Sequence, residues 1–205
     1  MKALLIVDVQ NDFCPGGALE VPAGDEIIPT INALSQSFDV VLQTQDWHPA
    51  AHSSFASSHE GREPFETIAM PYGEQVLWPD HCVQGSTGAA FHPELETNRS
   101  QLIIRKGFRR DIDSYSAFYE NDNATSTGLA GYLRERNIST LYVSGLATDF
   151  CVKWSVLDGL QEDFNVFVVE DAVKGIDLDG SVEQAWQEML DAGAQKTSSD
   201  ILLQP

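Results

Sequence analysis

Basic residues are scarce in this sequence. Its 205 residues include 12 lysines and arginines against 31 aspartates and glutamates, so the formal net charge at pH 7 is −19. A charge of this sign and size repels nucleic acids and anionic membranes, and it favours a neutral or cationic small molecule as the ligand. The same acidity also promotes solubility, so charge alone assigns no chemistry.

Cysteines and long apolar runs are scarce as well. The three cysteines are Cys14, Cys82 and Cys151, and their odd number and the lack of a C-x-x-C pair argue against a disulfide framework or a zinc knuckle. No apolar run is long enough to cross a bilayer. The N-terminal run Ala3 to Val7 is too short for a signal peptide and no cleavage site follows it. We therefore expect a cytoplasmic protein.

Strand patterns alternate with helical patterns along the chain. The strand patterns cover residues 2–7, 39–45, 101–107, 140–145 and 165–171, with a short sixth near 195–197. The helical patterns cover residues 24–38, 127–137, 151–160 and 181–193. This order predicts a three-layer α/β fold, in which helices cover both faces of a mainly parallel six-stranded sheet. The length favours one domain over residues 1–205, with a long and weakly periodic loop insertion at about 46–100.

Polar residues at the carboxyl ends of the predicted strands are the first functional candidates, because parallel sheets bind ligands there. Cys151 stands where the segment LYVSGLATDFCVKWSV passes from a strand into a helix. A thiol at a helix N-terminus has a lowered pKa and can act as a nucleophile. Asp8 and Lys106 end two other strands and could converge on it. Taken singly, a packing cysteine, a turn aspartate and a surface lysine explain the three residues as well.

A second polar group follows the strand at 39–45. Asp46 and His48 are two residues apart in the segment DWH, and His81 lies downstream in WPDHC. A carboxylate and two imidazoles are ordinary ligands of an open metal site of the catalytic type. His52 is a further candidate. From spacing alone, loop histidines that only form hydrogen bonds are an equally good explanation.

Taken together, several segments resemble one family, the nicotinamidases among the isochorismatase-like cysteine hydrolases. These segments are VDVQNDF (7–13), TQDWHP (44–49), WPDHCVQGSTGAAFHP (78–93), RKG (105–107), DSYSAF (113–118) and GLATDFCV (145–152). They appear in the family's order and span nearly the whole chain. The resemblance implies a catalytic triad of Asp8, Lys106 and Cys151. It also implies one divalent metal ion, most often zinc and otherwise iron or manganese, held by Asp46, His48 and His81, with His52 as an optional neighbour.

The resemblance also implies the substrate site. Its pocket would be lined by Phe13, Trp78, Tyr115, Leu146, Ala147 and Phe150. The N–H groups of Ala147 and Cys151 would form an oxyanion hole, beside a cis peptide bond between Leu146 and Ala147. The implied reaction is hydrolysis of nicotinamide to nicotinate and ammonia through a thioester on Cys151, as a step of NAD salvage. A pocket for a flat azine amide should also admit pyrazinamide, and whether the chain is a monomer or a homo-oligomer stays open.

Two other functions remain open on the sequence. Relatives with the same fold hydrolyse ureido or N-carbamoyl compounds with the same Asp, Lys and Cys, generally without the metal motif. A non-catalytic thiol or metal sensor built on a hydrolase scaffold would also retain a reactive Cys151. Isochorismate cleavage fits less well, because enzymes of that type lack the cysteine that stands here.

Overall fold

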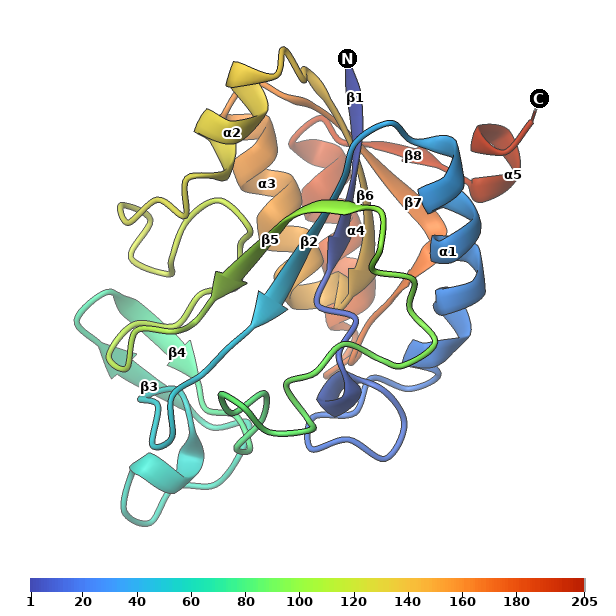
Figure 1. Cartoon of the computed structure of the whole chain (residues 1–205). Coiled ribbons are helices and arrows are strands. Elements are labelled where there is room, and N and C mark those ends of the chain that lie inside the picture. Colours follow the sequence, from blue (N-terminus) through green and yellow to red (C-terminus); the bar gives the residue numbers. More distant parts are fainter. Residues whose placement is uncertain (205) are drawn as a thin grey trace.

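Six parallel strands form the central sheet of the computed structural model, which describes residues 1–204 (Figure 1). Their order across the sheet is β5-β2-β1-β6-β7-β8, and every neighbouring pair is parallel. The strands are β1 (Lys2–Val7), β2 (Val41–Asp46), β5 (Ser100–Lys106), β6 (Thr140–Leu146), β7 (Asn165–Lys174) and β8 (Gln195–Thr197). The predicted α/β fold is therefore confirmed, including the short sixth strand.

Helices cover both faces of this sheet, as predicted. They are α1 (Ile28–Ser37), α2 (Leu129–Glu135), α3 (Lys153–Gln161), α4 (Ser181–Asp191) and α5 (Ser199–Leu202). Side chains alternate between the two faces of a strand. Leu5 of β1 accordingly lies in one core cluster with Val156 of α3, whereas Leu4 lies in the other with Ile31 of α1. Helices α2, α3 and α4 contribute to the first cluster, and α1 and α5 to the second.

The chain changes its winding direction between the adjacent strands β1 and β6. One half of the sheet grows from β1 through β2 to β5, and the other from β6 through β7 to β8. Gly145 near the end of β6 has a φ of 110°, and a Cβ there would lie 2.1 Å from the carbonyl oxygen of Val7. Glycine thus lets the two central strands approach each other where sheets of this order bind ligands.

Three local features differ from the pattern-based expectation. The segment between β2 and β5 contains an antiparallel hairpin, β3 (Thr67–Met70) and β4 (Gly73–Val76), whose one buried residue is the polar Gln75. Helix α1 starts only at Ile28, after a 3-10 turn at Gly24–Ile27, with Pro29 in its first turn. A π-helical turn at Thr148–Val152 precedes α3. Within residues 1–204, no helix is both long and apolar enough to span a membrane.

Candidate active site

Three charged side chains meet at the carboxyl edge of the sheet. Asp8 follows β1, Asp46 is the last residue of β2, and Lys106 is the last residue of β5. Asp46 and Lys106 are direct partners in the β2–β5 register. All three are buried, and Lys106 is only 1% exposed. A buried lysine has to find anionic partners, because an isolated charge in the protein interior is strongly unfavourable.

The ammonium group of Lys106 joins the predicted triad to the predicted metal ligands. Its Nζ lies 2.8 Å from Asp8 Oδ2 and donates hydrogen bonds to Asp46 Oδ1 at 2.8 Å, to the Ser114 carbonyl at 2.9 Å and to Cys151 Sγ at 3.3 Å. Burial lowers the pKa of Lys106, but Asp46 and Asp8 raise it well above its ordinary value. Lys106 is therefore a permanent buried cation between three groups that carry or can carry negative charge.

Both carboxylate oxygens of Asp8 are engaged. Oδ1 accepts a 2.6 Å hydrogen bond from the Thr44 hydroxyl, and Oδ2 lies 2.8 Å from the Lys106 ammonium. Burial raises the pKa of Asp8, and Lys106 offsets this rise only in part. A buried carboxylate with a raised pKa is suited to accept a proton.

Cys151 lies in the π-helical turn that follows β6, and it is 7% exposed. Burial raises the pKa of its thiol well above the ordinary value, with Lys106 acting in the opposite direction. The sequence had suggested a lowered pKa from the helix N-terminus, and desolvation outweighs that effect here. Deprotonation of this buried thiol therefore needs a base. As the resemblance implied, the peptide bond between Leu146 and Ala147 is cis.

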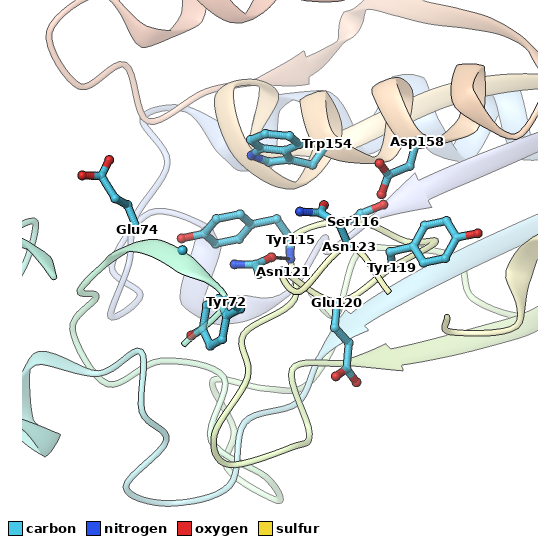
Figure 2. A pocket seen from close by; sticks show the side chains of 11 residues that line it. Tyr72, Glu74, Tyr115, Ser116, Tyr119, Glu120, Asn121, Asn123, Trp154 and Asp158 are labelled. Atoms are coloured by element: carbon cyan, nitrogen blue, oxygen red, sulfur yellow. Dashed lines mark hydrogen bonds between the residues drawn. The ribbon is translucent and has the colours of Figure 1, made fainter. Parts of the chain in front are cut away.

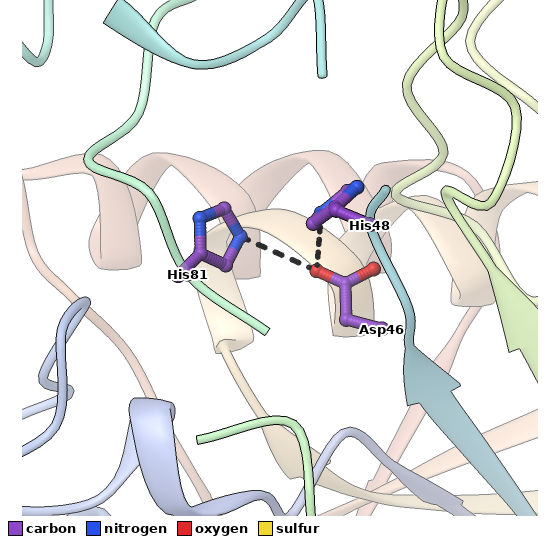
Figure 3. Close-up of side chains that lie close together, drawn as sticks. All are labelled: Asp46, His48 and His81. Carbon is purple, nitrogen blue, oxygen red and sulfur yellow. Dashed lines mark hydrogen bonds and ion pairs between the residues drawn. The ribbon is translucent and has the colours of Figure 1, made fainter. Parts of the chain in front are cut away.

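Asp46 lies between the imidazole rings of His48 and His81 (Figure 3). Its Oδ2 is 3.1 Å from His48 Nε2 and 3.4 Å from His81 Nε2. The opposite ring nitrogens, Nδ1 of each histidine, lie 2.9 Å from the Gly107 carbonyl and 2.8 Å from the Pro79 carbonyl. These carbonyls favour a proton on Nδ1, so each Nε2 presents a lone pair towards a carboxylate oxygen.

Lone pairs that face each other require a cation or an added proton between them. Burial raises the pKa of Asp46, yet Lys106 and His48 together hold it well below its ordinary value. Burial lowers the pKa of His48, and Asp46 more than reverses this. The three ligand atoms lie within 4.8 Å of one another, all on buried side chains. The donor set therefore fits a divalent metal ion of the kind bound by nitrogen and oxygen ligands.

His52 is placed beside this group but is engaged elsewhere. Its ring packs against His48 at a centroid distance of 4.4 Å. Its Nδ1 lies 2.7 Å from the Ser54 hydroxyl, and its Nε2 lies 2.7 Å from the Arg109 carbonyl. Because both ring nitrogens already have hydrogen-bonding partners, His52 supports His48 and offers no free lone pair to a metal in this arrangement.

A small pocket lies between Cys151 and the Asp/His group. It is lined by Phe13, Leu19, Asp46, Trp78, His81, Asp113, Tyr115, Ala147, Phe150, Cys151 and Ile176. The space is about 20 Å³, roughly room for one water molecule. Trp78 and Phe150 form one edge-to-face pair in its wall, with ring centroids 4.8 Å apart.

Five of the six predicted pocket residues line this space, and Leu146 does not. The Leu146 side chain is fully buried in the core cluster under α1 instead. Sequence reasoning missed Leu19, Asp113 and Ile176. Asp113 opens the DSYSAF segment and could have been found there, whereas Leu19 and Ile176 stand in loops without a motif.

The chain resembles known proteins over almost its whole length. The family model for the isochorismatase domain matches residues 2–201. The chain belongs to the isochorismatase family. The nicotinamidase of Acinetobacter baylyi is 58% identical over 98% of this chain and 94% of that protein. The solved structure of the Acinetobacter baumanii nicotinamidase/pyrazinamidase has a TM-score of 0.97 and 58% identity, and it covers 98% of this chain and 97% of that one.

Two further members of the family have structures with bound molecules. A protein from L. infantum, in complex with nicotinate, is 40% identical with a TM-score of 0.85, over 98% of this chain and 93% of that one. The pyrazinamidase of Pyrococcus horikoshii, in complex with zinc, is 36% identical with a TM-score of 0.78, over 96% of this chain and 98% of that one. Both structures share the fold of this chain.

Proposed function

We propose that this protein is a nicotinamidase, an amide hydrolase that converts nicotinamide and water to nicotinate and ammonia. One observation carries the proposal: the Lys106 ammonium contacts Asp8, Cys151 and the metal-ligand residue Asp46, and the last two line an aromatic pocket. The 58% identity to the Acinetobacter baylyi nicotinamidase supports the same substrate. A neutral substrate also suits a chain with a net charge of −19.

The reaction begins with a proton transfer from Cys151 to Asp8. Because burial raises the pKa of both groups, the thiol stays protonated until a substrate arrives and the carboxylate is a competent base. The sulfur then attacks the carboxamide carbon, and the carbonyl oxygen takes up the electron pair. The N–H groups of Ala147 and Cys151 are proposed to stabilise this oxyanion, where one such donor contributes about 3–4 kcal/mol in other hydrolases.

The second half of the reaction returns the proton. Protonated Asp8 donates to the departing nitrogen, the C–N bond breaks, and ammonia leaves behind a thioester on Cys151. Asp8 then takes a proton from a water molecule that attacks the thioester carbon, and nicotinate leaves as the thiol is restored. Lys106 lies against both partners and stabilises the anionic form of whichever holds the charge.

Asp46, His48 and His81 would hold one divalent ion, and we propose that it is zinc. When bound, such an ion supplies Lewis-acid polarisation and an anchor for a substrate's ring nitrogen. The aromatic walls, with Trp78 and Phe150 foremost, would hold the flat ring by stacking or edge contacts. On this proposal pyrazinamide is a second substrate, because it presents the same flat ring and carboxamide.

The location that we propose is the cytoplasm. All three cysteines are free thiols in the structure, which suits a reducing compartment.

The test is ammonia release from nicotinamide by four forms of the protein. They are the wild type, Cys151→Ala, a matched Cys14→Ala control, and wild type stripped with a chelator. We expect activity in the wild type and the Cys14 control, and loss in Cys151→Ala by at least about 10⁴-fold. The stripped form should lose activity and regain it with zinc.

Two other results would contradict parts of this proposal. Full activity after stripping would reject the metal site as a requirement while leaving the cysteine mechanism intact. No nicotinamide turnover by the untreated wild type, together with turnover of a ureido compound, would reject the proposal in favour of the second enzyme class.

A further inference from the structure

A second pocket shares the Tyr115 wall with the active site (Figure 2). Its volume is about 180 Å³, which is enough for a small organic molecule. Three segments surround it: helix α3, the loop at 115–123 and the turn between β3 and β4. We call it the α3 pocket, and its lining residues include Tyr72, Glu74, Tyr115, Tyr119, Trp154 and Asp158.

Asp158 is a buried charge without a counter-ion in the α3 pocket. The residue is 8% exposed, and its carboxylate forms no ion pair within residues 1–204. Basic side chains of the surrounding segments are engaged with other carboxylates: Arg109 pairs with Glu120 at 2.9 Å, and Lys153 pairs with Glu188 at 3.1 Å. The charge of Asp158 is therefore not compensated by either of these nearby cations.

Burial raises the pKa of Asp158, and the neighbouring Ser116 hydroxyl opposes this rise only in part. A largely buried carboxylate without a counter-ion is unfavourable, so a cation that reaches it from the pocket would be stabilised. Glu74 adds negative charge at the rim, and no lysine, arginine or histidine is among the residues that line the pocket within the described chain. Anions, nicotinate included, are disfavoured here.

The aromatic walls select the kind of cation. Trp154 and Asp158 are four residues apart on α3, so they lie on one face of the helix. Figure 2 shows the Asp158 carboxylate directed from α3 towards the loop that carries Ser116, and the Trp154 ring lying along the helix. The faces of tryptophan and tyrosine rings attract cations that carry carbon substituents, whereas a hydrated inorganic ion gains little from them. Lys153 Nζ already lies 5.0 Å from the centroid of the Trp154 ring, so a ligand cation would have to use the opposite face of that ring.

We propose that the α3 pocket binds a small organic cation of the alkylammonium class. Its positive nitrogen pairs with the Asp158 carboxylate, and its methyl or methylene groups pack against Trp154 and Tyr119. A neutral molecule of the same shape would leave Asp158 unpaired and would bind weakly. This site does not depend on the proposed amide hydrolysis, because none of its charged residues takes part in that chemistry.

The test is isothermal titration calorimetry at constant ionic strength with choline chloride as the probe. Its neutral isostere, 3,3-dimethylbutan-1-ol, serves as the comparison. We expect one saturable choline site in the wild type and no saturable heat from the alcohol. Asp158→Asn, which removes the charge and keeps the shape, should weaken choline binding by at least about tenfold. Trp154→Leu should weaken it as well, by loss of the aromatic face.

The control for net charge is Asp200→Asn, which removes the same charge from an exposed position on α5. It should bind choline like the wild type. Turnover of nicotinamide by Asp158→Asn reports that this variant is folded, independently of the binding result. The proposal is overturned if the wild type shows no saturable choline binding, or if Asp158→Asn binds as tightly as the wild type. It is also overturned if Asp200→Asn weakens binding to the same extent as Asp158→Asn.

Discussion

Lys106 Nζ donates a 2.8 Å hydrogen bond to Asp46 Oδ1, so the triad and the metal-ligand group share one buried ammonium. The pairing follows from the register of β2 and β5, which sets the two residues side by side at the sheet edge. The triad and the metal-ligand group are therefore electrostatically coupled, and a substitution of Lys106 changes the charge balance of both.

Replacement of Lys106 by methionine should destabilise the protein strongly. The change leaves Asp8 and Asp46 buried without their shared cation, and loss of one partner of a buried pair costs about 3–5 kcal/mol. Urea unfolding of chelator-stripped protein measures this, because no metal ion then replaces the missing charge. The matched control is Lys174→Met, whose 3.5 Å pair with Glu26 is exposed and should contribute no more than about 1 kcal/mol. Equal losses in the two variants would contradict the coupling.

The pH dependence of Cys151 alkylation should show a thiol with a raised pKa. Burial favours the neutral form, so the reactive thiolate is a small fraction at pH 7 and increases about tenfold for each pH unit below the pKa. The experiment treats metal-stripped protein with iodoacetamide and then measures turnover after zinc is restored. The rate of inactivation should increase from pH 6 to pH 9 without a plateau, roughly the range up to an ordinary thiol pKa. A rate that levels off below pH 7 would instead indicate a preformed thiolate.

Substitution of Gly107 by alanine should weaken metal binding. A Cβ at Gly107 would lie 2.4 Å from His48 Cε1 and 2.7 Å from His48 Nδ1, so the ring has to move out of line with Asp46. Disturbed support of a ligand histidine typically costs about 10–100-fold in metal affinity. Zinc competition with a chromogenic chelator measures the change.

The control for Gly107→Ala is Gly85→Ala, at which the backbone conformation is also left-handed. The φ angles are +64° at Gly107 and +79° at Gly85, and a Cβ at Gly85 meets nothing within 4 Å. Both variants carry the backbone strain of a non-glycine residue in this region, but only the first should lose zinc. Retention of wild-type zinc affinity by Gly107→Ala would show that His48 does not need its present position.

Gln75 of β4 should control the shape of the substrate pocket without touching the reacting atoms. Its fully buried Nε2 donates to Asp113 Oδ2 and to the Tyr115 hydroxyl, both at 2.9 Å, and the Trp78 indole N–H donates to the same hydroxyl at 3.1 Å. Gln75→Leu removes a donor from Asp113 and from Tyr115, which costs about 1–3 kcal/mol of stability. We expect KM for nicotinamide to rise more than kcat falls.

The matched control is Gln101→Leu, an exposed glutamine on β5 whose amide donates to the Asp39 carbonyl. It should change neither kinetic constant. A Gln75→Leu variant that loses kcat and leaves KM intact would place the effect on the chemical step, contrary to a positioning role.

The sequence determined the fold class and the chemical types at the site. Continuous apolar runs such as residues 2–7 predicted strands buried on both faces, and polar residues at their ends predicted where the chemistry lies. Asp8, Asp46, Lys106 and Cys151 were identifiable because strand ends and short motifs are local patterns. The hairpin of β3 and β4 was not, since its strands are only four residues long and their one buried residue is the polar Gln75.

Only the tertiary structure decided how these side chains interact. No local pattern shows that both nitrogens of His52 are occupied, that Leu146 faces the core, or that Asp158 is buried without a cation. Nor could the sequence assign the direction of the Cys151 pKa, because the helix terminus favours the thiolate while burial favours the thiol. Hydrogen bonding and desolvation depend on which segments distant in the chain pack together, and that information exists only once the chain is folded.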